Sequence, residues 1–556
     1  MNFVGGQLLT CFYSFMTALF AALIMVPFIR QWALDKENVD QPDPRKIHDV
    51  PMPRLGGIAI FLAFLFSAII FLPIDESIRG LLAGMLIIFA TGVVDDLNGI
   101  TSRSKFAGQV AACFTTILVG KLYLTDLGNL FGFGPVVMPV WLGILFTVFA
   151  VVGVINAINL IDGLDGLAGG VSSIALTAFF LIGWLENDPV TMILSAALVG
   201  AIFGFLKYNF YPARIFMGDT GSMVVGYVLA FIAVASTQRL GSSISPMVPV
   251  LILGLPLLDT VWVMTRRIVK RMSPFAADRT HIHHQFLDLG FEHRFTVVII
   301  YTISLFWAIC ALLLRNSPEY VLLLFYLATA LGSYFLLRSL VQKKERFSFL
   351  ERDDRTGIRS SSTYQMLSGY SDYLLIGIKL LLSLYLVVAL ASILKDSIIP
   401  WQVALILLGS GIYLWQSRQS DNRQFLMLIV YATFGLIATQ IWHMDLPIIA
   451  EISLKRCGDV LLGAAGVLAV IKILFRRVGE LFLTTADYLV LAVCIFLAIA
   501  SQQAVLGYNI NGPLFRTVVG VITLRTIATR DQVVQRTVLY CCFVVLLVVS
   551  VMGLMG

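Results

Sequence analysis

The sequence predicts an all-α, polytopic integral membrane protein, and three observations lead to this prediction. Of the 556 residues, 58% are hydrophobic and only 13% are charged, whereas soluble domains carry about 25% charged residues. The mean hydropathy is +0.89. Apolar runs of about 20 residues, the length that crosses a bilayer as a helix, recur from Leu8 to Met555. So few charges exclude a soluble enzyme and a disordered chain, and the runs are too uniformly apolar for barrel strands.

Eleven spans are predicted in the first module of the chain, residues 1–341. Their approximate limits are 7–29, 55–73, 79–94, 105–123, 138–158, 166–185, 189–206, 220–237, 246–265, 295–314 and 319–340. The first run has no basic segment before it and no small-residue cleavage site after it. We therefore expect it to be a retained span rather than a signal peptide.

The polar stretch 342–372 is predicted to be a cytoplasmic linker to a second membrane region, 373–556. Five or six further spans are expected there, near 373–394, 398–415, 424–441, 458–475, 484–503 and 533–555. The segment 514–528 is ambiguous. The region has no further acidic cluster beside a glycine-rich turn, so its role stays open between dimerisation, partner docking and lipid handling.

The placement of lysine and arginine predicts the orientation of the first module. The segments after the first, third, seventh and ninth spans contain 15 basic residues, whereas those after the second, fourth, sixth and eighth contain 3. Cytoplasmic loops carry the excess of lysine and arginine. We therefore expect the first group of segments on the cytoplasmic side and the N-terminus outside.

Five aspartates and one histidine-rich segment each follow an odd-numbered span. They are Asp95 and Asp96, Asp162 and Asp165, Asp219, and the segment 278–284 (DRTHIHH). Because every second crossing returns to the same side, all of them are predicted on the basic, cytoplasmic face. Acidic residues at membrane depth are costly and suggest function, although a single aspartate could simply end a helix.

The residues around these aspartates point to phosphate chemistry. Glycine-rich turns allow close backbone approach to a ligand, and a helix that starts just after GDTGS (218–222) would point its N–H groups at an anion. Carboxylate oxygens suit Mg²⁺, which binds through one or two carboxylates and substrate phosphates. Lys105, Arg279 and the histidines would neutralise the remaining phosphate oxygens. The face therefore predicts phosphoryl transfer on a diphosphate, with a membrane lipid as second substrate.

Zinc at the histidines is a weaker alternative. His281 and His283 alternate and His284 is adjacent, which is poor spacing for one helical face. The seven cysteines lie mostly in apolar runs and include no CxxC pair, which argues against a zinc ribbon or a disulfide framework.

Six motifs, in order, resemble one known family. They are DQPDPRKIHDVPMPRLGG (40–57), GVVDDLNGITSRSKFAGQ (92–109), NAINLIDGLDGLAGG (156–170), NFYPARIFMGDTGS (209–222), PLLDT (256–260) and SPFAADRTHIHH (273–284). The family is the polyprenyl-phosphate N-acetylhexosamine-1-phosphate transferases, in the bacterial branch that uses UDP-N-acetylglucosamine and undecaprenyl phosphate. The resemblance covers about residues 1–340. DRTHIHH departs from the HHH-type loop of the phospho-MurNAc-pentapeptide transferases, which argues against that peptidoglycan reaction and leaves it as the weaker alternative.

The resemblance implies a reaction and a cofactor. The phosphate of undecaprenyl phosphate attacks the β-phosphorus of a UDP-N-acetylhexosamine, and UMP leaves. Asn159 and Asp219 match the Mg²⁺ site, with Mn²⁺ as a substitute, and Asp95 and Asp96 match catalytic carboxylates. A lipid phosphate is already largely ionised near neutral pH, so we favour a positioning and electrostatic role for this pair, one member being protonated because like charges repel.

The remaining site residues are implied in the same way. Lys105 would contact phosphate, Asp162, Asp165 and Phe216 would lie near the uridine and metal, and Asp95, Asp96, Asp162, Asp165 and Lys105 form the expected catalytic set. The expected substrate-binding residues of the loops are Arg45, Lys46, His48, Arg279, His281, His283 and His284. For the first loop, which includes Arg54, the alternative is a topology signal. Capping or helix packing is as reasonable for Asp259 as a substrate contact.

A transporter or lipid flippase is the competing class. Transporters place their sites near the bilayer midplane on broken helices, whereas these motifs fall in loops and at span ends. A CDP-alcohol phosphotransferase would need DGxxAR…GxxxDxxxD, which the sequence lacks. We expect a multi-pass protein of the bacterial cytoplasmic (inner) membrane, in contact with the lipid bilayer, without a nucleic-acid partner and compatible with a homodimer. The sugar and the glycan pathway are left open.

Overall fold

The computed structural model describes most of the first module and separate stretches of the rest. The described residues are 2–36, 39–40, 52–239, 242–271, 281–342, 371–395, 399, 401–416, 422–443, 447–449, 452–474, 487, 489, 511–528 and 542–551. The chain divides into two compact units, Met1–Glu351 and Arg352–Gly556. This division falls inside the predicted linker, of which 343–370 lie outside the described residues.

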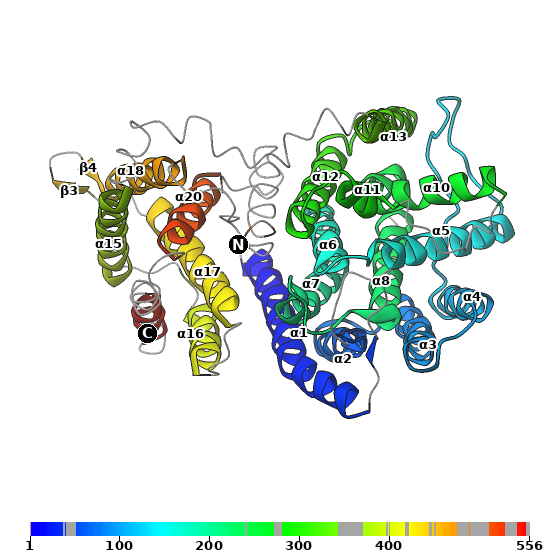
Figure 1. The fold of residues 1–556 in the computed structure, drawn as a ribbon, viewed down its shortest axis with the longest axis horizontal. Helices are drawn as coiled ribbons and strands as arrows, with labels where there is room; N and C mark the ends of the chain where they lie inside the picture. The colour runs from blue at the N-terminus through cyan, green and yellow to red at the C-terminus, as the bar shows by residue number, and fades with distance from the viewer. Residues whose placement is uncertain are drawn as a thin grey trace. The chain divides into compact units, whose positions relative to one another are not determined.

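The first unit is a helical bundle (Figure 1). Its helices are α1 (Asn2–Asp35), α2 (Gly56–Phe71), α3 (Glu76–Asn98), α4 (Ser102–Gly120), α5 (Val140–Ile161), α6 (Leu167–Leu185), α7 (Pro189–Asn209), α8 (Gly218–Gln238), α9 (Met247–Ile252), α10 (Gly254–Val269), α11 (Ile282–Asp288), α12 (His293–Leu313) and α13 (Glu319–Gln342). A short antiparallel pair, β1 (Val39–Asp40) with β2 (Met52–Pro53), precedes α2.

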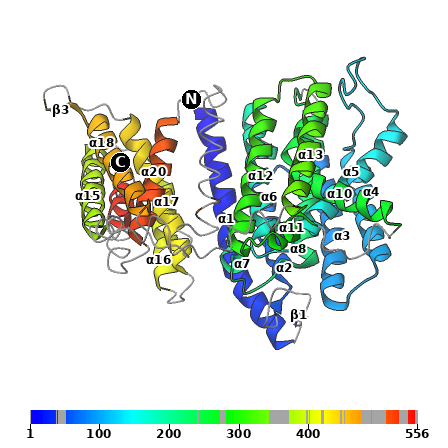
Figure 2. The same cartoon turned by 45° about the horizontal axis from the view of Figure 1, so that its top comes forward.

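Eight helices among the described residues are long and apolar enough to cross a membrane. All of them belong to the first unit. Figure 2 shows that the axes of several, including α1, α6, α12 and α13, are roughly aligned with one another. The shorter α2 is also apolar. These helices confirm the predicted all-α, polytopic membrane architecture.

Helix α8 lies at the centre of this unit and is buried along most of its length. It packs against α2, α3 and α5, and glycines allow the backbones to approach closely. A Cβ atom on Gly57 would lie 2.0 Å from the backbone N of Gly221, and one on Gly92 would lie 2.5 Å from Cα of Thr220. Small residues permit such contacts between membrane helices. They draw one end of α2, α3 and α8 together.

The ninth predicted span, 246–265, differs from the observed structure. It consists of two helices, α9 and α10, which meet at Leu253 and Gly254. Pro256 has no N–H to donate to the carbonyl of Ile252, four residues earlier, so the helical hydrogen bonds are interrupted at this point. The break therefore falls just before it, and α10 begins anew with Asp259 in its second turn.

The second unit contains α15 (Ser371–Lys395), α16 (Trp401–Gln416), α17 (Asn422–His443), α18 (Leu454–Leu474) and α20 (Asn511–Ala528), with a strand pair β3 (Pro447–Ile449) and β4 (Ile452–Ser453). The first four helices match predicted spans, and the ambiguous segment 514–528 is helical. Tyr385 of α15 stacks on Phe434 of α17, with ring centroids 5.2 Å apart. Most of the span expected at 484–503 lies outside the described residues.

Candidate active site

Four helix ends bring a polar cluster together: Asp95, Asp96, Lys105, Asn159 and Asp219. Nζ of Lys105 lies 3.1 Å from Oδ2 of Asp95 and also bonds Oδ1 of Asp219. Asn159 donates from Nδ2 to the same Asp219 oxygen at 2.5 Å and to Oγ of Ser222 at 2.8 Å. Residues separated by as many as 124 positions therefore meet at one end of the bundle, as the parity of the spans predicts.

Asp96 is turned toward the start of α8. Its carboxylate accepts hydrogen bonds from the backbone N–H of Asp219 at 2.8 Å, from the N–H of Thr220 at 2.9 Å and from the Thr220 hydroxyl at 2.5 Å. An anion is favoured at a helix N-terminus because of the unpaired N–H groups there. The helix was expected to start after GDTGS and to present these groups to a substrate anion. It starts at Gly218, and Asp96 itself occupies two of them.

The segment that leads into α2 and the loop before α8 are hydrogen-bonded to each other beside the polar cluster. The backbone N–H groups of Gly56 and Gly57 donate to the carbonyls of Phe216 and Met217, and Phe216 donates to Pro53. Gly218 has a φ of +73°, and a Cβ atom there would lie 2.1 Å from the carbonyl oxygen of Arg54. This backbone requires glycine and places Phe216, partly exposed, next to the cluster. Arg45, Lys46 and His48 lie outside the described residues.

The loop after α5 carries Asp162 and Asp165, which have different surroundings. Asp165 accepts a hydrogen bond from the backbone N–H of Ala213 at 2.9 Å. Asp162 has no side-chain hydrogen bond to any described residue. Removal from water, and then the negative charges of Asp219, Asp96 and Asp165, raise the pKa of Asp162 to about 7. The loop therefore holds a carboxyl group whose charge the surrounding protein does not stabilise.

The donor set of the polar cluster fits a hard divalent cation. Within the described residues, no group of three or more histidine, cysteine, aspartate or glutamate side chains is arranged to hold a metal. Mg²⁺ needs fewer, since it keeps waters and binds substrate phosphates. Asp219 supplies carboxylate oxygen, and Asn159, whose Nδ2 is engaged, still offers its carbonyl oxygen. The predicted Mg²⁺ site at these two residues stays a prediction.

The histidine segment, residues 281–284, lies at the start of α11. Nδ1 of His281 is 2.8 Å from Oδ2 of Asp259. His283 packs on the loop after α5: a Cβ atom on Gly163 would lie 2.3 Å from its Nε2. Burial, and then the neighbouring histidines, lower the pKa of His283 to about 3, so this ring is neutral near pH 7. Its buried Nδ1 has no hydrogen-bond partner in the described part of the chain.

The histidine segment thus reaches the aspartate loop, and the ring centroids of His283 and His284 lie 4.3 Å apart. Arg279 lies outside the described residues. The sequence did not single out Asn209, which is buried and joins two loops: it accepts from the N–H of Gly166 and donates to the carbonyl of Ile215. Its place at the start of the NFYPARIFMGDTGS motif was the one available signal.

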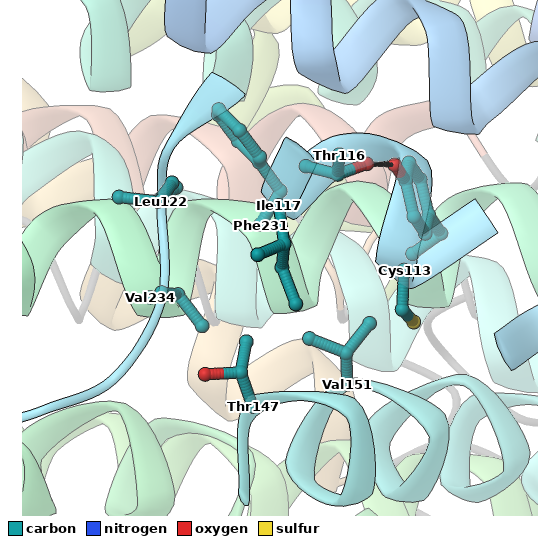
Figure 3. Close-up of a pocket in the computed structure, with 9 residues that line it drawn as sticks. Cys113, Thr116, Ile117, Leu122, Thr147, Val151, Phe231 and Val234 are labelled. Carbon is teal, nitrogen blue, oxygen red and sulfur yellow. Dashed lines mark hydrogen bonds between the residues drawn. The ribbon is translucent and has the colours of Figure 1, made fainter. Parts of the chain in front are cut away.

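A separate apolar pocket lies among α4, α5 and α8 (Figure 3). Its lining residues are Cys113, Thr116, Ile117, Leu122, Thr147, Val151, Tyr227, Phe231 and Val234. The hydroxyl groups of Thr116 and Tyr227 bond each other, and no lining residue carries a charge. The pocket therefore does not belong to the polar cluster.

Comparisons with known proteins identify relatives of the first unit. Residues 78–237, which carry the whole polar cluster, match the model of glycosyl transferase family 4. A probable undecaprenyl-phosphate N-acetylglucosaminyl 1-phosphate transferase of Bacillus subtilis (strain 168) is 33% identical over 309 residues, 55% of this chain and 85% of that protein. The undecaprenyl-phosphate alpha-N-acetylglucosaminyl 1-phosphate transferase of Escherichia coli (strain K12) is 33% identical over 331 residues, 58% of this chain and 89% of that protein.

A decaprenyl-phosphate N-acetylglucosaminephosphotransferase of Mycobacterium leprae (strain TN) is 34% identical over 294 residues, 48% of this chain and 74% of that protein. The aligned lengths are shorter than the first unit and much shorter than the whole chain. With its first unit this chain covers most of each relative, and it belongs to glycosyl transferase family 4, among the polyprenyl-phosphate N-acetylglucosaminyl 1-phosphate transferases.

Proposed function

We propose that the chain transfers N-acetylglucosamine 1-phosphate from UDP-N-acetylglucosamine to undecaprenyl phosphate. An oxygen of the lipid phosphate forms a bond to the β-phosphorus of the UDP-sugar, the bond from that phosphorus to UMP breaks, and undecaprenyl-diphospho-N-acetylglucosamine results. The observation that carries the proposal is the identity to the Bacillus subtilis transferase over 85% of its length, in a chain whose polar cluster has the chemistry that a diphosphate needs.

The residues of the cluster have separable roles in this reaction. Lys105 offers its positive charge to a phosphate oxygen, and Asp95 and Asp219 orient it. Asp96 fixes the first turn of α8 and therefore the place of Asp219. Asn159 and Asp219 would hold Mg²⁺ or Mn²⁺, which when bound neutralises charge on the diphosphate. Because the lipid phosphate is already ionised, positioning and electrostatics suffice and no proton-abstracting base is needed.

The location of the reaction is part of the proposal. The excess of basic residues after odd-numbered spans supports a cytoplasmic site and an outer N-terminus in a bacterial inner membrane. Single cysteines at Ser104, beside the cluster, and at Ser242, which follows α8, should react with an impermeant maleimide from opposite sides. Labelling of both from the same side would contradict this topology.

A membrane assay tests the reaction. Membranes that contain the full chain are incubated with undecaprenyl phosphate and, in parallel, with radiolabelled UDP-N-acetylglucosamine, its C4 epimer or UDP-MurNAc-pentapeptide. We expect a lipid-extractable product and equimolar UMP with the first sugar. Product only with the pentapeptide would favour the alternative reaction, and labelled sugar that crosses the membrane unchanged would favour a transporter.

A further inference from the structure

The most informative contact outside the polar cluster joins α10 to the histidine segment. Asp259 and His281 are buried, being 6% and 5% exposed. One oxygen of Asp259 lies 2.8 Å from Nδ1 of His281. The other accepts a hydrogen bond from the backbone N–H of Ile282, also at 2.8 Å. A single carboxylate therefore holds both the ring of His281 and the first residue of α11.

This contact selects one form of the His281 ring. An ionised carboxylate only accepts hydrogen bonds, so Nδ1 of His281 must carry the hydrogen. The ring nitrogen left to bind a proton or to meet a phosphate oxygen is Nε2. The hydrogen bond at one ring nitrogen commonly sets what the other can do. Asp259 thus determines which face of the imidazole can take part in chemistry.

The same contact bears on the loop that holds Asp162. His283, two residues after His281, lies against Gly163 with no room for a Cβ atom between them. The rings of His281 and His283 are nearly parallel, with centroids 5.8 Å apart and an interplanar angle of 8°. The histidine segment is therefore held between Asp259 on one side and Gly163 on the other.

We propose that Asp259 is a positioning residue of the transfer reaction, which holds His281 as the Nδ1–H tautomer and keeps the histidine segment on Gly163. The inference rests on the proposed function for its reaction, but the contact can be tested without substrate. Asp259 acts through His281 and not on the substrate itself.

The variant Asp259→Asn, in the full-length chain, separates positioning from simple helix capping. Its side-chain oxygen can still accept from Ile282, whereas its amide would donate to Nδ1 and force the hydrogen of His281 onto Nε2. For carboxylates that hold a metal-bound histidine, loss of the partner costs about 10- to 100-fold in metal affinity or activity, and we expect an effect of the same size here. We expect kcat to fall by that factor while KM for the UDP-sugar changes much less. The matched control is Asp188→Asn, which alters another partly buried carboxylate, paired with Arg239.

Two further measurements decide the case. In Asp259→Asn/His281→Ala the loss should equal that of His281→Ala alone, because Asp259 acts through the ring. The chain has six histidines, so ¹⁵N-histidine spectra of the folded protein are simple, and His281→Ala assigns the signal. We expect Nδ1–H in the wild type and Nε2–H in Asp259→Asn.

Several outcomes would overturn the proposal: an Nε2–H signal in the wild type, an unchanged kcat in Asp259→Asn, or losses that multiply in the double variant. The wild-type spectrum keeps the test valid even if Asp259→Asn does not fold. If wild-type protein forms no lipid product from any UDP-sugar, the proposed function fails, while the tautomer switch still shows whether Asp259 holds His281.

Discussion

Helix α3 has acidic residues at both ends, and the carboxylates at the two ends have different kinds of partner. At its N-terminus Asp75 accepts a hydrogen bond from the N–H of Ile78 at 2.8 Å, and Glu76 pairs with Lys121 at 3.2 Å. At the same end of the bundle, Asp188 caps α7 and pairs with Arg239 at 2.8 Å. Asp75 therefore caps its own helix, and Glu76 and Asp188 each have a basic partner of their own.

The end with the polar cluster contrasts with this. Asp96 does cap a helix, but the helix is α8, whose sequence is more than 120 positions away. Asp219 is shared between Lys105 and Asn159, and the side chain of Asp162 has no hydrogen-bond partner among the described residues. An acidic residue alone therefore does not indicate a site. A group of carboxylates with too few positive partners does: Asp95 and Asp219 share the single charge of Lys105, so a cation with a phosphate ligand can supply the missing positive charge.

The largest effect is expected from Asp219→Asn. The change removes the charge that Lys105 and the predicted Mg²⁺ share, while the shape of the side chain is kept. We expect the rate of UMP release to fall about 1,000-fold, the upper range for loss of one electrostatic group at a reacting phosphate or carbonyl. The yield and thermal stability of the purified protein should stay near wild type.

Chelation gives the companion measurement. Excess EDTA should stop transfer in the wild type, and added Mg²⁺ or Mn²⁺ should restore it. Full activity in the chelator, or an Asp219→Asn enzyme with a tenth of wild-type activity, would contradict the assignment of this residue to a cation site.

A smaller effect is expected from Asp96→Asn. Asparagine caps helices about as well as aspartate, so one oxygen can still accept from the N–H of Asp219, but the bonds to Thr220 weaken. We expect activity to fall about 10- to 100-fold, as for other residues that orient a ligand. If instead the Asp96→Asn enzyme is as inactive as Asp219→Asn, Asp96 acts directly in the chemistry rather than by fixing α8.

The sequence was sufficient for the all-α membrane architecture and for the meeting of the polar residues at one end of the bundle, although the span drawn at 246–265 is two helices. Apolar runs of membrane length are read directly from composition, and alternate crossings bring Asp95, Lys105, Asn159 and Asp219 to one face whatever the details of packing. The direction in which each side chain points was not predictable. Asp96 reaches α8 because Gly92 and Gly57 let three helices approach, and such distances depend on packing across the whole bundle.

The Asp259–His281 contact could not be predicted from the sequence, for a related reason. Asp259 was left undecided between capping, packing and substrate contact, since hydropathy drew one continuous span from 246 to 265. The break before Pro256 separates α9 from α10, and the contact with His281 depends on where α10 begins and on how the chain returns from α10 toward α11. Residues 272–280, which connect them, lie outside the described part of the chain.

Two glycine-to-alanine variants test whether transfer depends on the position of His283 against the loop after α5. In Gly163→Ala the new methyl group would meet Nε2 of His283, which is buried at 2% exposure and has little room to move. Displacement of a substrate-contacting group by about 1 Å can cost about 100-fold, and we expect a loss of about 10-fold or more in kcat/KM for the UDP-sugar.

The matched control is Gly153→Ala, where a Cβ atom on α5 has no neighbour within 4 Å. It should keep wild-type activity and could gain slightly in stability, because alanine favours the helix by about 1 kcal/mol. Equal activity in both glycine variants would show that the position of His283 does not matter for transfer.

The smallest effect on activity is expected at the opposite end of the bundle, from Asp188→Asn. This carboxylate caps α7 through the N–H groups of Val190 and Thr191 and pairs with Arg239. Asparagine keeps the oxygen that accepts from these N–H groups, but it removes the ion pair and the oxygen that accepts from the Thr191 hydroxyl at 2.6 Å. The side chains of Asp188 and Arg239 are 20% and 25% exposed, so water screens the pair in part, and we expect a loss of about 1 kcal/mol or less in stability.

Transfer should stay within about 2-fold of wild type, because a local stability change does not reach a site whose geometry is set by other helix ends. The measurement is a thermal unfolding curve beside the UMP-release assay. A drop in activity comparable to that of Asp96→Asn, in protein that is still folded, would mean that the two ends of the bundle are coupled and that the contrast between them does not separate structural from functional carboxylates.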